Sequence, residues 1–141
     1  MDIDALVAEQ DRAFNEGDVI SYVDKTTYPL TVYLGTARVV IEDPLDAGLK
    51  LDWLDRRLRD AGVHRIETTV LSNVAVSDTV AIVGTRRNRF DKAGGRINSC
   101  SLTYTFLRQE EDWKLNTIYV EDDFWVNSSC VAQNKGEGET V

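Results

Sequence analysis

Apolar residues recur along this chain with two different periods, and the period changes near the middle. At the start, apolar residues share one helical face over residues 2–16, again in a short segment after Asp18, and again after Asp43. From residue 63 onward the pattern alternates over four runs, at 63–76, 79–91, 96–108 and 113–122. The first three runs far exceed the ~5–6 residues of an average strand. The order predicts three helices followed by a meander of long strands.

The helix boundaries carry the clearest local signals. Gly17 supplies a left-handed stop for the first helix, and Asp18 then caps a short second helix. In the third helix, Asp43 stands at the N-cap and Pro44 at the first helical position, where unpaired amides and the helix dipole favour both residues. Gly62 ends this helix. We therefore predict a helix over residues 43–61, with the Asp43 side chain accepting a hydrogen bond from an amide two or three residues on.

Two further features shape the predicted fold. Residues 28–34 and 37–41 form two short apolar runs joined by a Gly-Thr turn, which predicts a hairpin before the third helix.

The third helix has two apolar stripes where one would be enough to cover a sheet. We expect one stripe to lie on the sheet, and the other to meet helices, a pocket mouth or a partner subunit. The longer stripe contains Ala47, Leu51, Leu54, Leu58 and Ala61, and the second contains Leu45, Leu49 and Trp53.

Composition indicates one globular domain, predicted at residues 1–126. The chain has 141 residues, of which 43% are hydrophobic, which suffices for an ordinary core. Residues 127–141 are polar and rich in glycine, and we expect them to be disordered. The net charge of −8 works against binding to nucleic acid. No apolar run approaches the ~20 residues of a membrane span, and the start of the chain lacks a signal-peptide pattern, so we expect a cytoplasmic protein with no membrane partner.

The cysteine and histidine residues are too few and too scattered for a metal site. Cys100 lies in a predicted strand, Cys130 lies in the polar tail, and His64 is the one histidine. Two cysteines cannot complete a four-ligand zinc site unaided. We therefore expect two reduced thiols, no metal and no cofactor.

Two short motifs resemble a known superfamily. The segment Phe-Asn-Glu-Gly-Asp at residues 14–18 resembles the Asn-x-Gly-Asp junction between the first two helices of nuclear transport factor 2-like (NTF2-like) proteins. Asp-Trp-Lys-Leu at residues 112–115 resembles the Gly-Trp-Lys-Ile that opens their last strand. The superfamily includes SnoaL-like polyketide cyclases and ketosteroid isomerase. The resemblance implies an α+β cone, with three N-terminal helices on a curved, mostly antiparallel sheet, a pocket between them, and usually a dimer. The superfamily holds many unrelated activities, so the fold does not decide the function.

The first catalytic candidate is Asp43. Ile-Glu-Asp-Pro at residues 41–44 resembles the motif that carries the general base of ketosteroid isomerase. The isomerase also needs a tyrosine on its first helix and an acid on its penultimate strand to stabilise the developing enolate. Residues 2–16 contain no tyrosine, and the strand between Ile97 and Gln109 contains no acidic residue. We therefore favour the N-cap role for Asp43 over the catalytic one.

A second candidate set resembles the Asp-Arg-Asp water-activating group of epoxide hydrolases in the same superfamily. Arg86, Arg87 and Arg89 follow one another on a predicted strand, and Asp122 ends a neighbouring one. An arginine paired with Asp122, with Arg86 as the candidate, would orient a water molecule. The alternative interpretation is that these arginines lie at an exposed strand end and are solvated, and we favour it because exposed charges rarely mark a site.

The third interpretation is binding without chemistry. Aromatic residues are frequent near the predicted sheet, and aromatic pockets hold flat or apolar ligands well. We predict a pocket for a small apolar or aromatic molecule and a homodimer formed through the sheet. An isomerase or hydrolase using Asp43 or Asp122 and a protein-interaction module remain the alternatives. The predicted pocket residues are Phe14, Trp53, Tyr104, Phe106, Ile118 and Val120.

Overall fold

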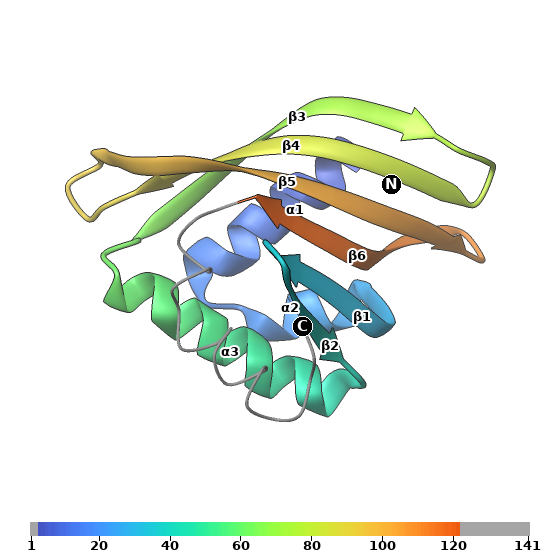
Figure 1. Cartoon of the computed structure of the whole chain (residues 1–141), viewed down its shortest axis with the longest axis horizontal. Helices are drawn as coiled ribbons and strands as arrows, with labels where there is room; N and C mark the ends of the chain where they lie inside the picture. The colour runs from blue at the N-terminus through green and yellow to red at the C-terminus, as the bar shows by residue number, and fades with distance from the viewer. Residues whose placement is uncertain (1–2, 122–141) are drawn as a thin grey trace.

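A curved six-stranded sheet with three helices on one face forms the framework of this protein (Figure 1). The computed structural model describes residues 3–121. The strand order is β2-β1-β6-β5-β4-β3, and all neighbouring pairs are antiparallel except β1 and β6, which are parallel. The predicted α+β architecture is confirmed. The elements are α1 (Ile3–Glu16), α2 (Val19–Asp24), β1 (Thr26–Leu34), β2 (Ala37–Ile41), α3 (Pro44–Asp60), β3 (Arg65–Ala75), β4 (Val80–Phe90), β5 (Arg96–Gln109) and β6 (Asp112–Glu121).

The predicted helix boundaries are confirmed. Gly17 follows α1 with a φ of 70°, a backbone conformation that glycine adopts without strain. The carboxylate of Asp18 accepts a hydrogen bond from the amide of Ser21 at 3.3 Å and so caps α2. At the start of α3, Asp43 Oδ1 accepts from the amide of Asp46 at 2.8 Å, with Pro44 as the first helical residue. Local sequence chemistry therefore fixes where α1 ends and where α2 and α3 begin.

The cap at Asp43 gives a first prediction. Replacing Asp43 with alanine should lower the free energy of unfolding by about 1 kcal/mol, because the amide of Asp46 loses its acceptor at the end of the helix where the dipole favours negative charge. Urea denaturation monitored by circular dichroism measures the change. The control is Asp52→Ala, which removes an exposed ion pair with Arg56 on the same helix and should cost less. Equal stability of wild type and Asp43→Ala would contradict the capping role.

Side chains on the concave face of the sheet form the core beneath the helices. The buried residues on this face include Leu102 and Tyr104 of β5, Val83 of β4 and Ile66 of β3. Val83 and Tyr104 are paired across β4 and β5. Helix α1 covers the edge strand β3, where the amide and carbonyl of Ile66 pair with the side chain of Asn15 at 2.8 and 3.1 Å. This asparagine belongs to the Phe-Asn-Glu-Gly-Asp segment, so that segment joins the helical layer to the edge of the sheet.

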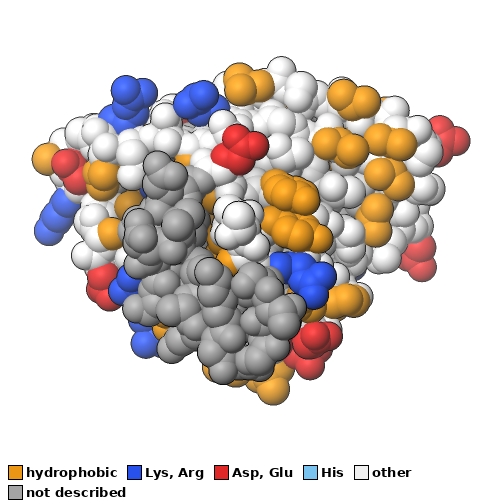
Figure 2. All heavy atoms as spheres, viewed as in Figure 1, with side chains coloured by type: hydrophobic (Ala, Val, Ile, Leu, Met, Phe, Trp, Pro, Cys, Tyr) orange, Lys and Arg blue, Asp and Glu red, His pale blue; other side chains and the backbone are white. Residues whose placement is uncertain are grey.

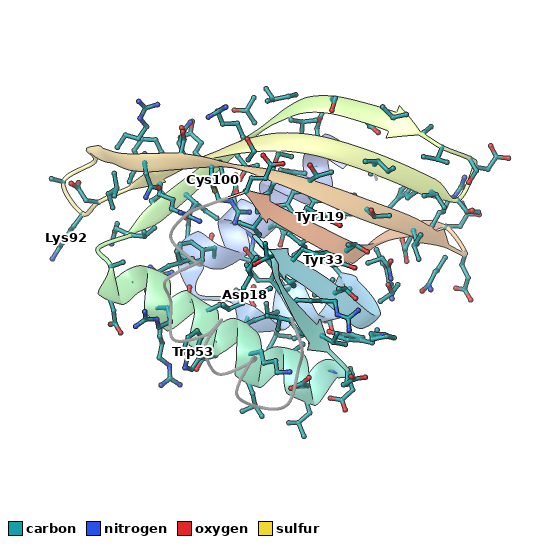
Figure 3. The ribbon with its side chains drawn as sticks, viewed as in Figure 1. Asp18, Tyr33, Trp53, Lys92, Cys100 and Tyr119 are labelled. Atoms are coloured by element: carbon teal, nitrogen blue, oxygen red, sulfur yellow. The ribbon has the colours of Figure 1, made fainter. Side chains whose placement is uncertain are left out.

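The opposite face of the sheet carries exposed apolar side chains. Figure 2 shows hydrophobic side chains gathered over the strands on this face. Ile82 is 41% exposed and Tyr119 is 50% exposed, while their neighbours along each strand point to the core. Tyr119 stacks on Tyr33 with ring centroids 4.3 Å apart (Figure 3). We call Leu71, Val74, Val76, Ile82 and Tyr119 the outer apolar patch.

The two stripes of α3 have different surroundings. Ala47 and Leu58 of the longer stripe are buried against the core. Of the second stripe, Leu45 is 76% and Leu49 is 67% exposed, while Trp53 is partly buried against the core.

Some expectations concern residues beyond those described. The predicted polar tail at 127–141, Cys130 and the candidate Asp122 lie outside residues 3–121. Within residues 3–121, no helix has the length and hydropathy needed to cross a membrane.

Candidate functional site

An apolar cavity lies between the helices and the concave face of the sheet. Its volume is about 120 Å³. Leu51, Leu54 and Leu58 of α3 form one wall, so the longer apolar stripe of this helix faces the cavity. The sheet supplies the opposite wall, where Leu102 pairs with Val120, and Val120 with Leu34. The remaining lining residues are Ala13, Phe14, Gly17, Val19, Tyr22, Val32, Asp55 and Ile118.

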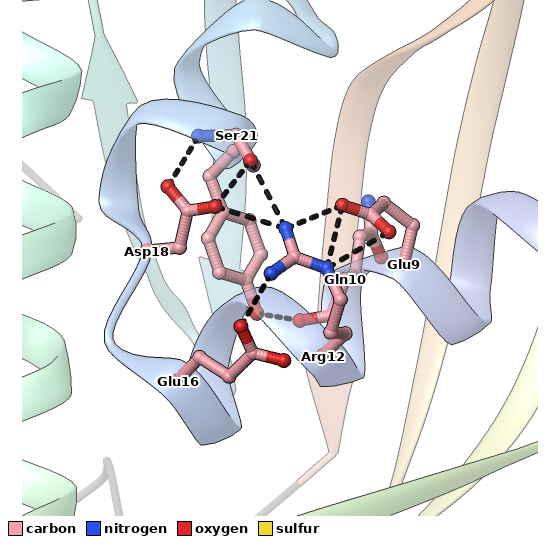
Figure 4. Close-up of polar contacts among 7 residues, drawn as sticks. Glu9, Gln10, Arg12, Glu16, Asp18 and Ser21 are labelled. Atoms are coloured by element: carbon pink, nitrogen blue, oxygen red, sulfur yellow. Dashed lines mark hydrogen bonds and ion pairs between the residues drawn. The ribbon is translucent and has the colours of Figure 1, made fainter.

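A salt-bridge cluster fixes α1 against α2 beside this cavity (Figure 4). Arg12 contacts Glu9 at 2.6 Å, Glu16 at 2.9 Å and Asp18 at 2.9 Å. Hydrogen bonds from Ser21 and then from Arg12 lower the pKa of Asp18, and the Arg12 hydrogen bond lowers the pKa of Glu9. Because Asp18 also caps α2, the cluster sets the position of the helix that carries Val19 and Tyr22 into the cavity wall.

Two lining residues have polar side chains. The hydroxyl of Tyr22 donates to the carbonyl of Gln10 at 2.8 Å, which ties its ring to α1. Asp55 Oδ2 accepts from Arg59 Nε at 3.1 Å. Arg59 also lies over the ring of Phe14, 4.5 Å from its centroid. The cavity is thus apolar apart from one engaged hydroxyl and one carboxylate.

A hydrogen-bonded chain of polar side chains runs from α1 into the sheet. Asp11 accepts from both the amide and the hydroxyl of Thr68, each at 2.6 Å. Arg87 donates from Nε to the hydroxyl of Thr68 at 3.1 Å and from Nη2 to the hydroxyl of Tyr104 at 2.8 Å. The chain joins α1, β3, β4 and β5. The positive charge of Arg87 therefore lies among protein groups that can balance it.

The pKa shifts in this chain follow from burial and charge. Burial by itself would lower the pKa of Arg87, but Tyr104, Tyr22 and Asp11 outweigh burial and raise it, so the guanidinium stays charged. Burial raises the pKa of Tyr104, and the charge of Arg87 partly opposes that rise. Both groups hold their ordinary protonation states at neutral pH.

Tyr22 gives a prediction about alkaline stability. Burial raises its pKa well above the ordinary value of 10.0, so the unfolded chain loses this proton at lower pH than the folded protein does. The Tyr22 contribution is therefore complete below pH 10 and is lost as pH rises above it. Tyr22→Phe should flatten the fall in unfolding free energy above pH 10 by up to ~1.4 kcal/mol per pH unit. Urea denaturation at pH 8 to 11.5 checks this, with Tyr119→Phe as control, and an unchanged slope would contradict it.

The structure separates the six predicted pocket residues into two groups. Phe14, Ile118 and Val120 line the cavity. Trp53 lies outside this lining, with the guanidinium of Arg57 5.6 Å from its ring centroid. Tyr104 and Phe106 are buried core residues that pack against each other, with ring centroids 5.7 Å apart.

The candidate catalytic residues do not meet at one site within the described residues. Asp43 is exposed at the start of α3 and is absent from the cavity lining. Arg86 is exposed and donates to the hydroxyl of Ser99 at 3.1 Å. The interpretation of Arg86, Arg87 and Arg89 as a solvated group is wrong for the last two, because Arg87 bonds to core hydroxyls and Arg89 is 2% exposed. Strand alternation explains the difference, since Arg87 and Arg89 share the inner face with Val83 and Thr85.

Sequence reasoning missed Asp11 and Asp55, and it named Arg87 among the hydrolase-like arginines but assigned it to solvent. For Arg87 a signal was present, because it stands four residues after Val83 on the same side of an alternating strand. Asp11 stands on a helix rich in charged residues, and nothing in its spacing marks it. Asp55 stands four residues after Leu51 and three before Leu58, a helical spacing that places it within the longer apolar stripe. Within residues 3–121, no group of three or more His, Cys, Asp or Glu side chains is arranged to hold a metal ion.

Comparison with known proteins assigns this architecture to a known family. The model of a family described as NTF2-like protein (DUF6841) matches residues 3–123. The chain belongs to this NTF2-like family. A search of curated proteins gives no significant match. The NTF2-like assignment agrees with the three helices on one face of a curved sheet described above.

Several solved structures share the fold of this NTF2-like protein at low sequence identity. An NTF2-like protein of unknown function from Shewanella oneidensis has a TM-score of 0.66 and 17% identity, covering 85% of this chain and 96% of that one. Aln2 from Streptomyces has a TM-score of 0.68 and 12% identity, covering 88% and 90%. A protein from Catenulispora acidiphila, in complex with S-DNPA, has a TM-score of 0.64 and 14% identity, covering 89% and 95%. These likenesses establish the fold alone.

Proposed function

We propose that this NTF2-like protein binds one small apolar molecule, about the size of a six-membered ring, in the cavity between its helices and sheet. The observation that carries this proposal is a space of about 120 Å³ with an almost wholly apolar lining. An apolar cavity of roughly 150 Å³ stays dry and takes up benzene, so a space of this size suits a single ring. Water gains few hydrogen bonds against such walls, and an apolar ligand therefore displaces little that is favourable.

Binding fits the lining better than catalysis does. A proton-transfer site needs a base together with preorganised donors near the reacting atoms. Among the described lining residues, Asp55 is already bonded to Arg59 and the Tyr22 proton is already donated to Gln10. A protein of this fold from Catenulispora acidiphila is in complex with S-DNPA, which supports a binding role for the fold. Binding without chemistry is thus the role we assign to the cavity.

Titration of the ¹⁵N-labelled protein with toluene tests the proposal. We expect saturable amide shifts at Phe14, Leu54 and Leu102. Leu54→Trp should abolish them, because the larger side chain fills the space. The matched control is Leu45→Trp, which places the same side chain at an exposed position of the same helix and should leave binding intact. Shifts that do not saturate, or that persist unchanged in Leu54→Trp, would overturn the proposal.

We also propose that the protein is a homodimer formed through the outer apolar patch. The patch lies on the sheet face that the described helices leave uncovered, and a sheet face with exposed apolar side chains needs a second cover (Figure 2). Val74 pairs directly with Ile82, and Tyr119 stacks on Tyr33, so apolar side chains lie next to one another on this face. Two copies related by a two-fold axis bury the same patch on each other, which is the commonest geometry of soluble oligomers.

Light scattering after size-exclusion chromatography tests the dimer. We expect twice the mass of the chain at micromolar concentration and the mass of one chain for Ile82→Lys. Leu49→Lys places the same charge on an exposed apolar position of α3 and should leave the dimer intact. A wild-type monomer, or a dimer that Ile82→Lys does not weaken, would overturn this arrangement.

A further inference from the structure

One carboxylate interrupts the apolar wall of the cavity. Asp55 stands on the inner face of α3, beside Leu51, Leu54 and Leu58. Its side chain is 19% exposed. A charged group on such a wall costs free energy unless hydrogen-bond donors satisfy it. The hydrogen-bond partners of Asp55 therefore show which donors a ligand would still have to supply.

Arg59 satisfies one oxygen of this carboxylate and is itself firmly held. Its Nε donates to Asp55 Oδ2 at 3.1 Å. Its two other nitrogens donate to the backbone carbonyls of Phe14 and His64. Asp55 Oδ1 accepts no hydrogen bond from any residue in the range 3–121. The carboxylate thus keeps one acceptor oxygen beside the cavity, while Arg59 keeps the side chain in place.

The other polar group of the lining has no proton to offer. Tyr22 donates its hydroxyl proton to the carbonyl of Gln10 at 2.8 Å, and burial raises the pKa of this hydroxyl so that it stays neutral. Asp55 is therefore the polar group of the cavity wall that can still accept a hydrogen bond from a ligand. A carboxylate accepts strongly from hydroxyl and amine donors and repels other anions.

We infer that Asp55 is a specificity-determining residue that selects apolar ring-sized ligands carrying one hydrogen-bond donor, such as a phenol. This inference rests on the proposed binding function and adds the chemical class of the ligand. The apolar walls hold the ring, and Asp55 Oδ1 accepts a hydrogen bond from the hydroxyl group. A hydrogen bond to a charged acceptor is among the stronger ones in proteins.

Phenol and toluene test the inference, because they have nearly the same shape and differ in one donor. The dissociation constants of both are measured by NMR titration for wild type, Asp55→Leu and Asp55→Asn. We expect the preference for phenol over toluene to fall by roughly 10-fold or more in Asp55→Leu, the change that follows from losing a hydrogen bond to a charged group. Asp55→Asn keeps the size of the side chain and an acceptor oxygen, so it should lose less. The control Asp52→Leu removes a carboxylate of the same helix that pairs with Arg56 outside the cavity, and should leave the preference unchanged.

The possible outcomes distinguish this inference from the proposed binding function on which it rests. A drop in the preference with Asp55→Leu, absent in Asp52→Leu, supports the inference. Binding of both ligands with a preference that neither Asp55 variant alters overturns the inference while leaving the binding function standing. Failure of both ligands to bind the wild-type protein overturns the binding function and, with it, the role of Asp55.

Discussion

Replacing Asp11 with alanine is expected to lower the free energy of unfolding by about 3 kcal/mol, one of the two largest effects that the structure predicts for a single side chain. The Asp11 carboxylate accepts two hydrogen bonds from Thr68, each at 2.6 Å, and hydrogen bonds to charged groups contribute about 1.5–3 kcal/mol each. Its loss also removes a carboxylate whose charge helps to raise the pKa of Arg87. Charges that lose a compensating partner away from water destabilise proteins strongly.

Urea denaturation of three variants separates these contributions. Asp11→Asn retains an acceptor for Thr68 and removes the charge, so it should cost less than Asp11→Ala. Glu16→Ala removes a carboxylate from the same helix that pairs with Arg12 on the surface, and exposed pairs contribute roughly 0.2–1 kcal/mol. Similar stabilities of Asp11→Ala and Glu16→Ala would show that the chain from Asp11 to Tyr104 does not stabilise the fold.

Replacing Leu58 with alanine is expected to cost about 3 kcal/mol and to make the protein more responsive to apolar ligands. Leu58 is 7% exposed and lines the cavity, and buried leucine-to-alanine changes cost roughly 2–5 kcal/mol, rising with the size of the space they leave. The enlarged cavity should accept toluene readily. A ligand at about 100 times its dissociation constant adds ~2.7 kcal/mol to the stability of the state that binds it.

The comparison with Leu115→Ala makes this prediction specific. Leu115 is 2% exposed in the core and is absent from the cavity lining, so its replacement should cost a similar amount. The unfolding free energy of each variant is measured with and without saturating toluene. We expect toluene to recover more of the loss in Leu58→Ala than in Leu115→Ala. Equal recovery in both variants would mean that enlarging the space beside Leu58 does not strengthen the binding of toluene.

The sequence predicted the fold well because its signals are local. The Asp43-Pro44 start and the glycine stop after α1 depend on backbone groups within a few residues, and the structure has both where the sequence places them. The long strands follow from alternation that each strand displays by itself. The Phe-Asn-Glu-Gly-Asp segment carried the family resemblance, and the contacts of Asn15 with Ile66 give it a structural purpose.

The candidate site and the polar chain from Asp11 to Tyr104 were harder to predict because they depend on contacts between residues far apart in the chain. Asp11 bonds to Thr68, 57 positions away, and Arg87 bonds to Tyr104 across a strand pair. Neither contact follows from helical or strand periodicity. Charged residues are mostly exposed, and that prior directed the interpretation of Arg87 toward solvent. The position of Asp55 inside an apolar stripe became informative once the structure placed the stripe on a cavity.

The most direct measurement is a crystal structure of the protein soaked in toluene. The proposed function predicts electron density for one ring between α3 and the sheet, in contact with Phe14, Leu54 and Leu102, and no such density in crystals of Leu54→Trp. Toluene found only on the outer surface, or a cavity filled with ordered water at saturating toluene, would contradict the account.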